Sequence, residues 1–226
     1  MFEYVEREQE QTLVFIPGWA FDCRIFAGLD LPYNYLFYNG QSIGNFEGQL
    51  QETIIARNIQ NLSLFGWSQG AFAACNFASK NPDIVNEVIL SGVKKKYEKE
   101  GLEKIKNYLS KNAHLYLSRF YKQCFCKSEK EHYEWFRDVF LKDYMNQFSP
   151  KLLAENLDWM NKMSIEPKQL MNLKQITILH GETDAIAPVE EAIEIANSLP
   201  GCRFISFEQT GHLPFLREDF ASLLYD

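Results

Sequence analysis

The sequence predicts an α/β fold in which a mostly parallel sheet carries helices on both faces. Short apolar runs alternate with helix-like stretches along most of the chain, as in successive strand–helix–strand units. The alternation stops between about residues 94 and 170, where the pattern is helical throughout. A chain of 226 residues, 46% of them hydrophobic, is long enough for one large domain with an insertion. We therefore expect a core domain of residues 1–93 and 171–226, with a helical cap at 94–170.

Six apolar segments are predicted to be strands: Thr12–Ile16, Tyr35–Tyr38, Leu62–Phe65, Val88–Leu90, Ile176–Leu179 and Phe204–Phe207. Three stretches between them are predicted to be helices: Glu47–Gln60, Gln69–Ser79 and Val189–Leu199. Pro188 suits a helix start, because its missing N–H costs nothing there. Asn81-Pro82 ends the preceding helix. An early hairpin is expected to be reduced to at most Phe2–Arg7.

The predicted cap is rich in aromatic residues from Tyr108 to Trp159. Ser149-Pro150 and Glu166-Pro167 mark breaks, so we expect about four helices. The density of rings predicts an apolar channel, although some of the rings must simply pack the helices together.

Composition excludes several classes of protein. The formal net charge of −7 argues against a nucleic-acid binder. No run of 18 apolar residues exists, so no membrane span is expected, and the acidic start MFEYVEREQEQ lacks an apolar signal segment. Five irregularly spaced cysteines suit a reducing compartment. We expect a cytoplasmic protein that is a monomer or a weak dimer.

The segment LSLFGWSQGAFAA, residues 62–74, places Gly66-Trp67-Ser68-Gln69-Gly70 between a predicted strand and a predicted helix. Gly-x-Ser-x-Gly in this context is typical of a nucleophile elbow. The serine occupies a tight, strained turn, so the residues two before and two after it must be small. The following helix directs its N-terminal N–H groups at the site. The alternative is a glycine-rich turn that merely buries a serine.

Partners for Ser68 follow two later strands. A serine nucleophile needs a base, and the base needs a carboxylate that fixes its tautomer. Asp184 follows ITILHG in HGETDAIAP, and His212 follows the last predicted strand in EQTGHLPFL. The chain order Ser68, Asp184, His212 is a known order of nucleophile, acid and base. Glu182 becomes the acid if the loop takes another register.

The other histidines and the cysteines are weaker candidates for catalysis or metal binding. His114 and His132 lie in the predicted cap, and His180, beside Gly181, is more typical of a structural histidine. Cys124-Phe125-Cys126 lacks the spacing of a structural zinc site, so we expect no metal.

A serine that attacks a carbonyl group forms a negatively charged tetrahedral intermediate, so the site also needs an oxyanion hole. One N–H is expected from Gln69, directly after the nucleophile. The second is expected from Trp19, in the loop Pro17–Ala20 after the first central strand. The Trp19 ring either walls the pocket or packs in the core.

Four stretches, LVFIPGWAFD, LFGWSQGAFAA, HGETDAIAP and GHLPFL, resemble α/β-hydrolases, and within them the pimeloyl-[acyl-carrier protein] methyl ester esterases of biotin synthesis. The resemblance implies a carboxylesterase that removes a methyl ester from an acyl chain on acyl-carrier protein, with no cofactor. It implies the same triad and oxyanion positions. The chain departs from the pattern by lacking the usual Asp-x-x-Gly-x-Gly-x-Ser loop between Tyr35 and Asn61, and by having Gln69 where an apolar residue is common.

Charge is divided unevenly along the chain. Residues 94–170 hold 16 Lys and Arg against 11 Asp and Glu, whereas the remainder holds 7 against 19. Acyl-carrier proteins are acidic, so a cationic cap is suited to docking one, although basic residues often form only a solvated face. The candidate docking residues are Arg119, Lys122, Lys127, Arg137 and Lys142.

Other functions remain open on the same fold. A thioesterase or an esterase of small molecules would use the same triad. A lyase or synthase of the menaquinone branch would use the triad as a base, and typically needs arginines near the pocket, where Arg24 is the only obvious one. A non-catalytic ligand receptor is a further alternative, because fold does not fix function.

Overall fold

The computed structural model describes residues 1–225, and its centre is a sheet of seven strands in the order β1-β3-β2-β4-β5-β6-β7. β1 runs antiparallel to β3, and the other neighbouring strands are parallel. The strands are β1 Phe2–Val5, β2 Thr12–Ile16, β3 Asn34–Tyr38, β4 Leu62–Trp67, β5 Val85–Ser91, β6 Ile176–Gly181 and β7 Arg203–Phe207. Each predicted strand lies within an observed one, which confirms the mostly parallel sheet.

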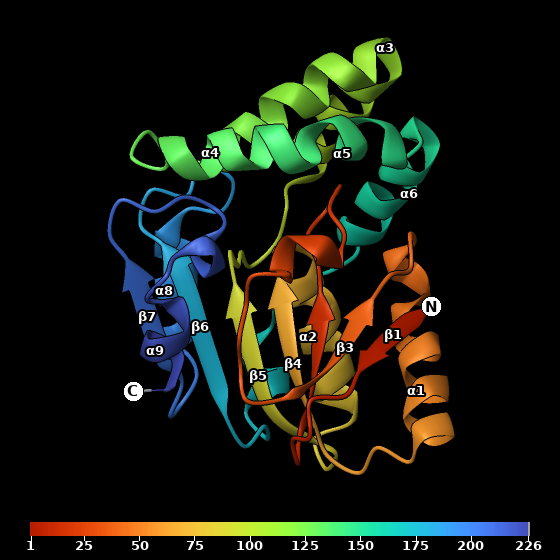
Figure 1. Cartoon of the computed structure of the whole chain (residues 1–226), viewed down its shortest axis with the longest axis vertical. Coiled ribbons are helices and arrows are strands. Elements are labelled where there is room, and N and C mark those ends of the chain that lie inside the picture. The colour runs from red at the N-terminus through yellow and green to blue at the C-terminus, as the bar shows by residue number, and fades with distance from the viewer. Residues whose placement is uncertain (226) are drawn as a thin grey trace.

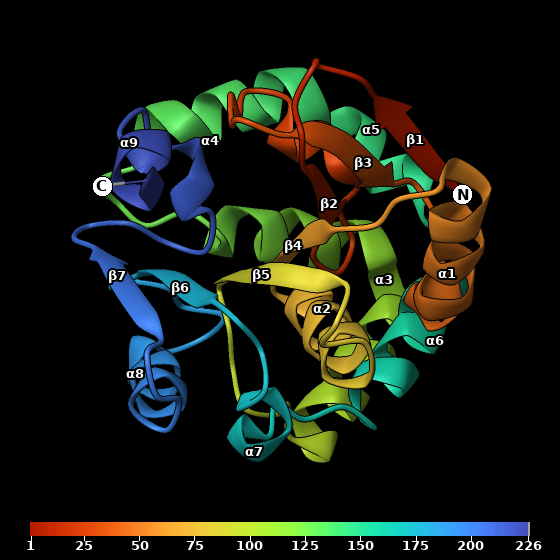
Figure 2. The same ribbon diagram turned by 90° about the horizontal axis from the view of Figure 1, so that it is seen from below.

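Helices cover both faces of this sheet (Figure 2). α1 (Phe46–Arg57), α2 (Gln69–Lys80) and α8 (Val189–Asn197) lie on one face, and the short α9 (Phe220–Tyr225) lies on the other. α1 ends three residues before the predicted boundary because Asn58 takes a left-handed conformation, with φ 52°. No helix among residues 1–225 combines the length and the apolar character that a membrane crossing requires.

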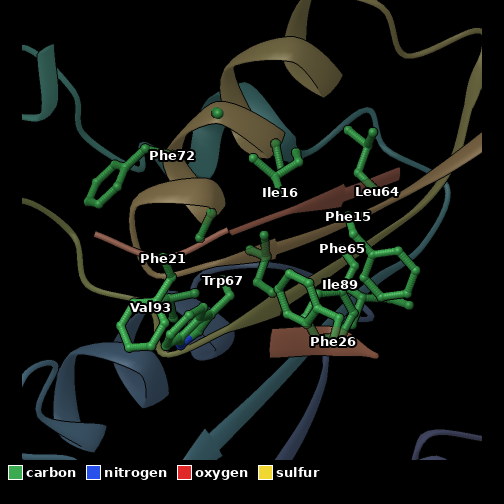
Figure 3. Packing of buried hydrophobic residues seen from close by; sticks show 14 of the residues in the cluster. Phe15, Ile16, Phe21, Phe26, Leu64, Phe65, Trp67, Phe72, Ile89 and Val93 are labelled. Carbon is green, nitrogen blue, oxygen red and sulfur yellow. The ribbon is translucent and has the colours of Figure 1, made fainter. Parts of the chain in front are cut away.

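The central strands are buried on both sides. Every residue of β2 and β4 is buried, as expected for parallel strands with helices on both faces. Phe15 of β2 packs against Phe65 of β4, with ring centroids 5.5 Å apart. Nearer the cap, Phe21 lies edge-on to Trp67 at 4.7 Å (Figure 3). The apolar core therefore extends directly to the end of β4, where Ser68 begins the next segment.

The segment between β5 and β6 is helical. Its elements are α3 Lys99–Gln123, α4 Lys130–Phe136, the π-helical turn η3 Arg137–Leu141, α5 Lys142–Gln147, α6 Pro150–Met160 and α7 Pro167–Leu170. α4, η3 and α5 follow one another without interruption, whereas α3 is kinked at Asn112, whose backbone is not helical, so two helices meet there. α3 to α6 lie above the carboxyl ends of the strands (Figure 1).

Aromatic side chains of α3, α4 and α5 join the cap to the core. Tyr121 donates its hydroxyl hydrogen to the backbone oxygen of Ala20 at 2.7 Å. The Phe21 ring packs against Tyr121, Phe136 and Tyr144, with centroids 5.1, 5.9 and 5.3 Å away. These cap rings also pack against one another. They therefore form a packed interface between cap and core, and the expected channel remains a prediction.

Candidate active site

Ser68 occupies a strained turn between β4 and α2. Its backbone has φ 55° and ψ −114°, outside the regions that residues with side chains normally adopt. A Cβ atom at Gly66 would lie 2.6 Å from the oxygen of Gly70, and one at Gly70 would lie 2.1 Å from the oxygen of Ile16. Both flanking glycines are thus required by close backbone contacts. The turn has the geometry of a nucleophile elbow.

Asp184 and His212 form a buried pair. His212 Nδ1 lies 2.6 Å from Asp184 Oδ2, and the residues are only 1% and 7% exposed. Asp184 Oδ1 accepts the backbone N–H groups of Ile186 and Ala187 at 2.8 and 2.9 Å. A carboxylate can only accept, so the hydrogen lies on His212 Nδ1. His212 Nε2 is left as the acceptor that a general base requires.

The charge of Asp184 is maintained despite its burial. Burial by itself raises the pKa of this carboxyl group. The charge and hydrogen bond of His212, the neighbouring His180 and the N–H of Ala187 outweigh it, so the pKa lies below its ordinary value. Asp184 is therefore ionised at neutral pH and can stabilise a positive charge on His212.

His180 lies on the other side of Asp184. Its Nε2 donates to the backbone oxygen of Ala187 at 2.7 Å and lies 3.5 Å from Asp184 Oδ2. Burial lowers the pKa of His180, and the Asp184 charge opposes this only in part. The ring is therefore neutral at neutral pH, in keeping with the structural role that the sequence predicts.

The remaining candidates lie elsewhere. Glu182 is exposed and accepts from the Ser206 hydroxyl at 2.8 Å, so it does not face His212. His114 is exposed on α3, and His132 lies on α4. Residues 1–225 contain no group of three His, Cys, Asp or Glu side chains arranged to hold a metal ion.

A side chain that the sequence did not indicate lies near the proposed nucleophile. It is Tyr97, in the connection from β5 to α3. Burial raises the pKa of its hydroxyl, and the nearby Ser68 side chain opposes the rise. The Tyr97 ring packs against Phe72 at 5.9 Å. His212 bonds to Asp184 through Nδ1, and the hydrogen bonds of residues 1–225 include none from Ser68 Oγ to His212 Nε2 or to Tyr97.

The two proposed oxyanion donors lie next to Ser68. Gln69 is the first residue of α2, so its N–H has no partner within the helix. The loop before Trp19 passes against Ser68, since a Cβ at Gly18 would lie 3.2 Å from the Ser68 Cβ. Among residues 1–225, the N–H of Trp19 makes no hydrogen bond to another backbone group.

The side chains of Trp19 and Gln69 both bond to α6. Trp19 Nε1 donates to the backbone oxygen of Leu153 at 3.0 Å, and Gln69 Nε2 donates to that of Asn156 at 3.0 Å. The Trp19 ring also meets Phe120 of α3 edge-on at 5.0 Å. The polar side chain of Gln69, a departure from the resembled pattern, thus serves as a link to the cap.

The five docking candidates are all exposed. Arg119 and Lys122 lie on α3, Lys127 in the α3–α4 connection, Arg137 in η3 and Lys142 at the start of α5. Arg137 pairs with Asp138 at 2.8 Å. Their role in docking remains a prediction.

Comparisons with known proteins show the fold. No family model and no curated protein matches the sequence. Among solved structures, the chain is similar to an esterase from Exiguobacterium antarcticum (TM-score 0.81, 20% identity, 99% of this chain and 92% of that one). It is similar to MGS-M2, an α/β-hydrolase enzyme from a Medee basin deep-sea metagenome library (TM-score 0.81, 15% identity, 99% of this chain and 92% of that one). It is also similar to a thermophilic esterase from Thermogutta terrifontis (TM-score 0.82, 18% identity, 99% of this chain and 90% of that one). The chain has the α/β-hydrolase fold.

Proposed function

We propose that the protein is a serine hydrolase that cleaves carboxylic esters through an acyl-enzyme. The observation that carries the proposal is the buried His212–Asp184 pair, 2.6 Å apart, in a chain whose strained elbow presents Ser68. Elbow, acid and base each follow a strand of one parallel sheet, so all three lie at its carboxyl edge. The structural neighbours that are esterases support the same class of reaction.

The reaction starts when the Ser68 hydroxyl donates a hydrogen bond to His212 Nε2. His212 Nε2 then takes the hydroxyl proton while Oγ bonds to the ester carbonyl carbon. The oxyanion that forms accepts the N–H groups of Gln69 and Trp19. Collapse breaks the bond to the alcohol oxygen, which leaves with the proton from His212. A water molecule repeats the attack and releases the acid and Ser68.

We propose the methyl ester of a pimeloyl chain on acyl-carrier protein as the substrate. The support is the resemblance in the four sequence stretches, together with the net charge of +5 on residues 94–170 against −12 on the remainder. α3 to α6 lie above the carboxyl ends of the strands (Figure 1), so a basic cap is suited to docking an acidic carrier on the side of the sheet where Ser68 follows β4. Localisation in the cytoplasm remains a prediction.

Mass spectrometry of pimeloyl-carrier methyl ester incubated with the protein tests this function. We expect the ester to lose its methyl group, and the Ser68→Ala variant to leave it intact. Hydrolysis of free p-nitrophenyl esters without any action on the carrier-bound ester would replace the substrate but keep the chemistry. Failure to cleave any carboxylic ester or thioester would reject the hydrolase proposal.

A further inference from the structure

We propose that Glu129, on the connection between α3 and α4, is a positioning residue for His212. This inference rests on the proposed function, in which His212 is the general base. Glu129 would fix the backbone of the loop that carries His212, so that the cap holds the base in place as well as covering the site.

The carboxylate of Glu129 is buried against the histidine loop. Its Oε2 accepts the backbone N–H of Gly211 at 2.8 Å and that of Cys126 at 2.8 Å, and the residue is 7% exposed. It makes no salt bridge within residues 1–225, so its direct partners are backbone N–H groups, with the more distant Arg217, whose pKa its charge helps to raise. Burying a charge is costly without such partners, and hydrogen bonds to an ionised acceptor are strong ones.

Glu129 does not use this carboxylate for its own helix. It occupies the N-cap position of α4, where a short polar side chain such as Ser, Thr, Asp or Asn ordinarily accepts one of the helix's first N–H groups. No such bond forms here. The carboxylate instead bonds to Gly211, 82 residues away in the chain and directly before His212. Capping α4 therefore does not explain its position.

Neighbouring contacts join the same two segments. The N–H of His212 donates to the backbone oxygen of Cys124 at 2.8 Å, and the Ser128 hydroxyl donates to that of Gln209 at 2.7 Å. A Cβ at Gly211 would lie 2.6 Å from the Cys124 oxygen and 2.8 Å from Glu129 Oε2. The close approach thus depends on glycine at 211, and residues 124–129 contact the loop from Gln209 to His212.

The position of His212 decides whether it can act. Its Nδ1 must stay on Asp184 while its Nε2 reaches Ser68, and a displacement of about 1 Å from productive geometry can cost about 10²-fold in rate. Loss of the Glu129 bond frees the Gly211 N–H and loosens the backbone directly before the base. We therefore expect kcat to fall with KM nearly unchanged, since both N–H groups that Glu129 Oε2 accepts belong to the protein backbone and the residue is buried.

Three variants and a matched control test the inference on p-nitrophenyl acetate. Glu129→Ala should lower kcat about 10- to 100-fold, and Glu129→Asp, which keeps the charge but shortens the reach, about fivefold. Glu129→Gln should keep most of the activity, because its amide oxygen can still accept both N–H groups. Glu131→Ala removes an exposed carboxylate from α4 and should change neither parameter. Glu129→Asp keeps the test decisive if Glu129→Ala does not fold.

Proton NMR gives a readout that does not require turnover. The hydrogen-bonded Nδ1 proton of His212 should appear at low field in the wild type and Glu131→Ala, and should weaken or shift in Glu129→Ala and Glu129→Asp. Wild-type kcat and an unchanged Nδ1 proton in folded Glu129→Ala and Glu129→Asp would overturn the inference, whatever happens to the melting temperature. A wild type that cleaves no ester yet shows this dependence would reject the proposed function alone.

Discussion

Trp67 donates its indole Nε1–H to the backbone oxygen of His212 at 2.8 Å. The residue before the proposed nucleophile therefore holds the proposed base, although 145 positions separate them. Their rings lie 5.4 Å apart, and Trp67 is fully buried. With the Cys124 oxygen accepting the His212 N–H, the histidine backbone is fixed from the core on one side and from the cap on the other.

Replacing Asp184 by Asn should lower kcat for ester hydrolysis by about 10⁴-fold. The amide oxygen can still accept from Ile186 and Ala187, but the NH₂ group would face His212 Nδ1 and favour the wrong tautomer. Steady-state kinetics on p-nitrophenyl acetate measures the effect, and thermal unfolding checks that the variant is folded. Glu182→Gln, two residues away on the surface, serves as the control. If Glu182→Gln is the more damaging change, Asp184 is not the acid.

His180 should make folding stability depend on pH. Because its folded-state pKa is lowered by burial, the unfolded chain binds a proton at this residue below about pH 6.5 that the folded protein does not. The free energy of unfolding should therefore decrease as pH falls from about 6.5 towards the folded-state pKa. Above about pH 6.5, where His180 is neutral in both states, this loss of stability should be absent. Urea unfolding at about pH 7.5 and pH 5 measures the difference.

The His180→Gln variant should lose less stability than the wild type between these two pH values. His114→Gln, on the exposed surface of α3, should behave like the wild type. An equal loss in wild type and His180→Gln would show that the burial of His180 does not control this part of the acid response.

Tyr97 should limit the size of the acyl group that reaches Ser68. Its hydroxyl lies near enough to Ser68 for that side chain to lower its pKa, and its ring packs against Phe72, so truncation to Ala should open space near the nucleophile. We expect the ratio of kcat/KM for p-nitrophenyl hexanoate to that for acetate to rise in Tyr97→Ala. Each buried CH₂ contributes about 0.8 kcal/mol, so four additional methylenes leave room for a change well beyond tenfold. An unchanged ratio would place the acyl chain away from Tyr97.

The basic cap should make carrier-bound substrate sensitive to salt. Surface charges act mainly on the association rate and are screened beyond about 8 Å at about 0.15 M salt. We expect kcat/KM for pimeloyl-carrier methyl ester to fall steeply as salt increases, while that for a small neutral ester stays level. Reversal of Arg119, Lys122 and Arg137 to Glu should weaken only the first reaction. Parallel salt slopes for the two substrates would indicate that the cap is a solvated face.

The sequence alone predicts the mostly parallel sheet that the structure contains and the three residues proposed as the triad. Ser68, Asp184 and His212 each follow a strand, and the carboxyl ends of parallel strands meet at one edge. The roles of Tyr97 and Glu129 could not be predicted in this way. Tyr97 comes near Ser68 through the path of the β5–α3 connection, and Glu129 meets Gly211 through the packing of the cap, and neither leaves a local pattern. The short α9 and the π-turn at Arg137–Leu141 are likewise too brief for a readable periodicity.

Labelling with a fluorophosphonate, followed by peptide mass spectrometry, tests the central claim most directly. The probe reacts with a serine only when a base withdraws its proton, so it reports on Ser68, His212 and Asp184 together. We predict one adduct per chain, located on Ser68, with no labelling of the folded Ser68→Ala variant and strongly slowed labelling of Asp184→Asn. A folded wild-type protein that remains unlabelled, or that carries its adduct on another residue, would contradict the assignment of Ser68 as an activated nucleophile.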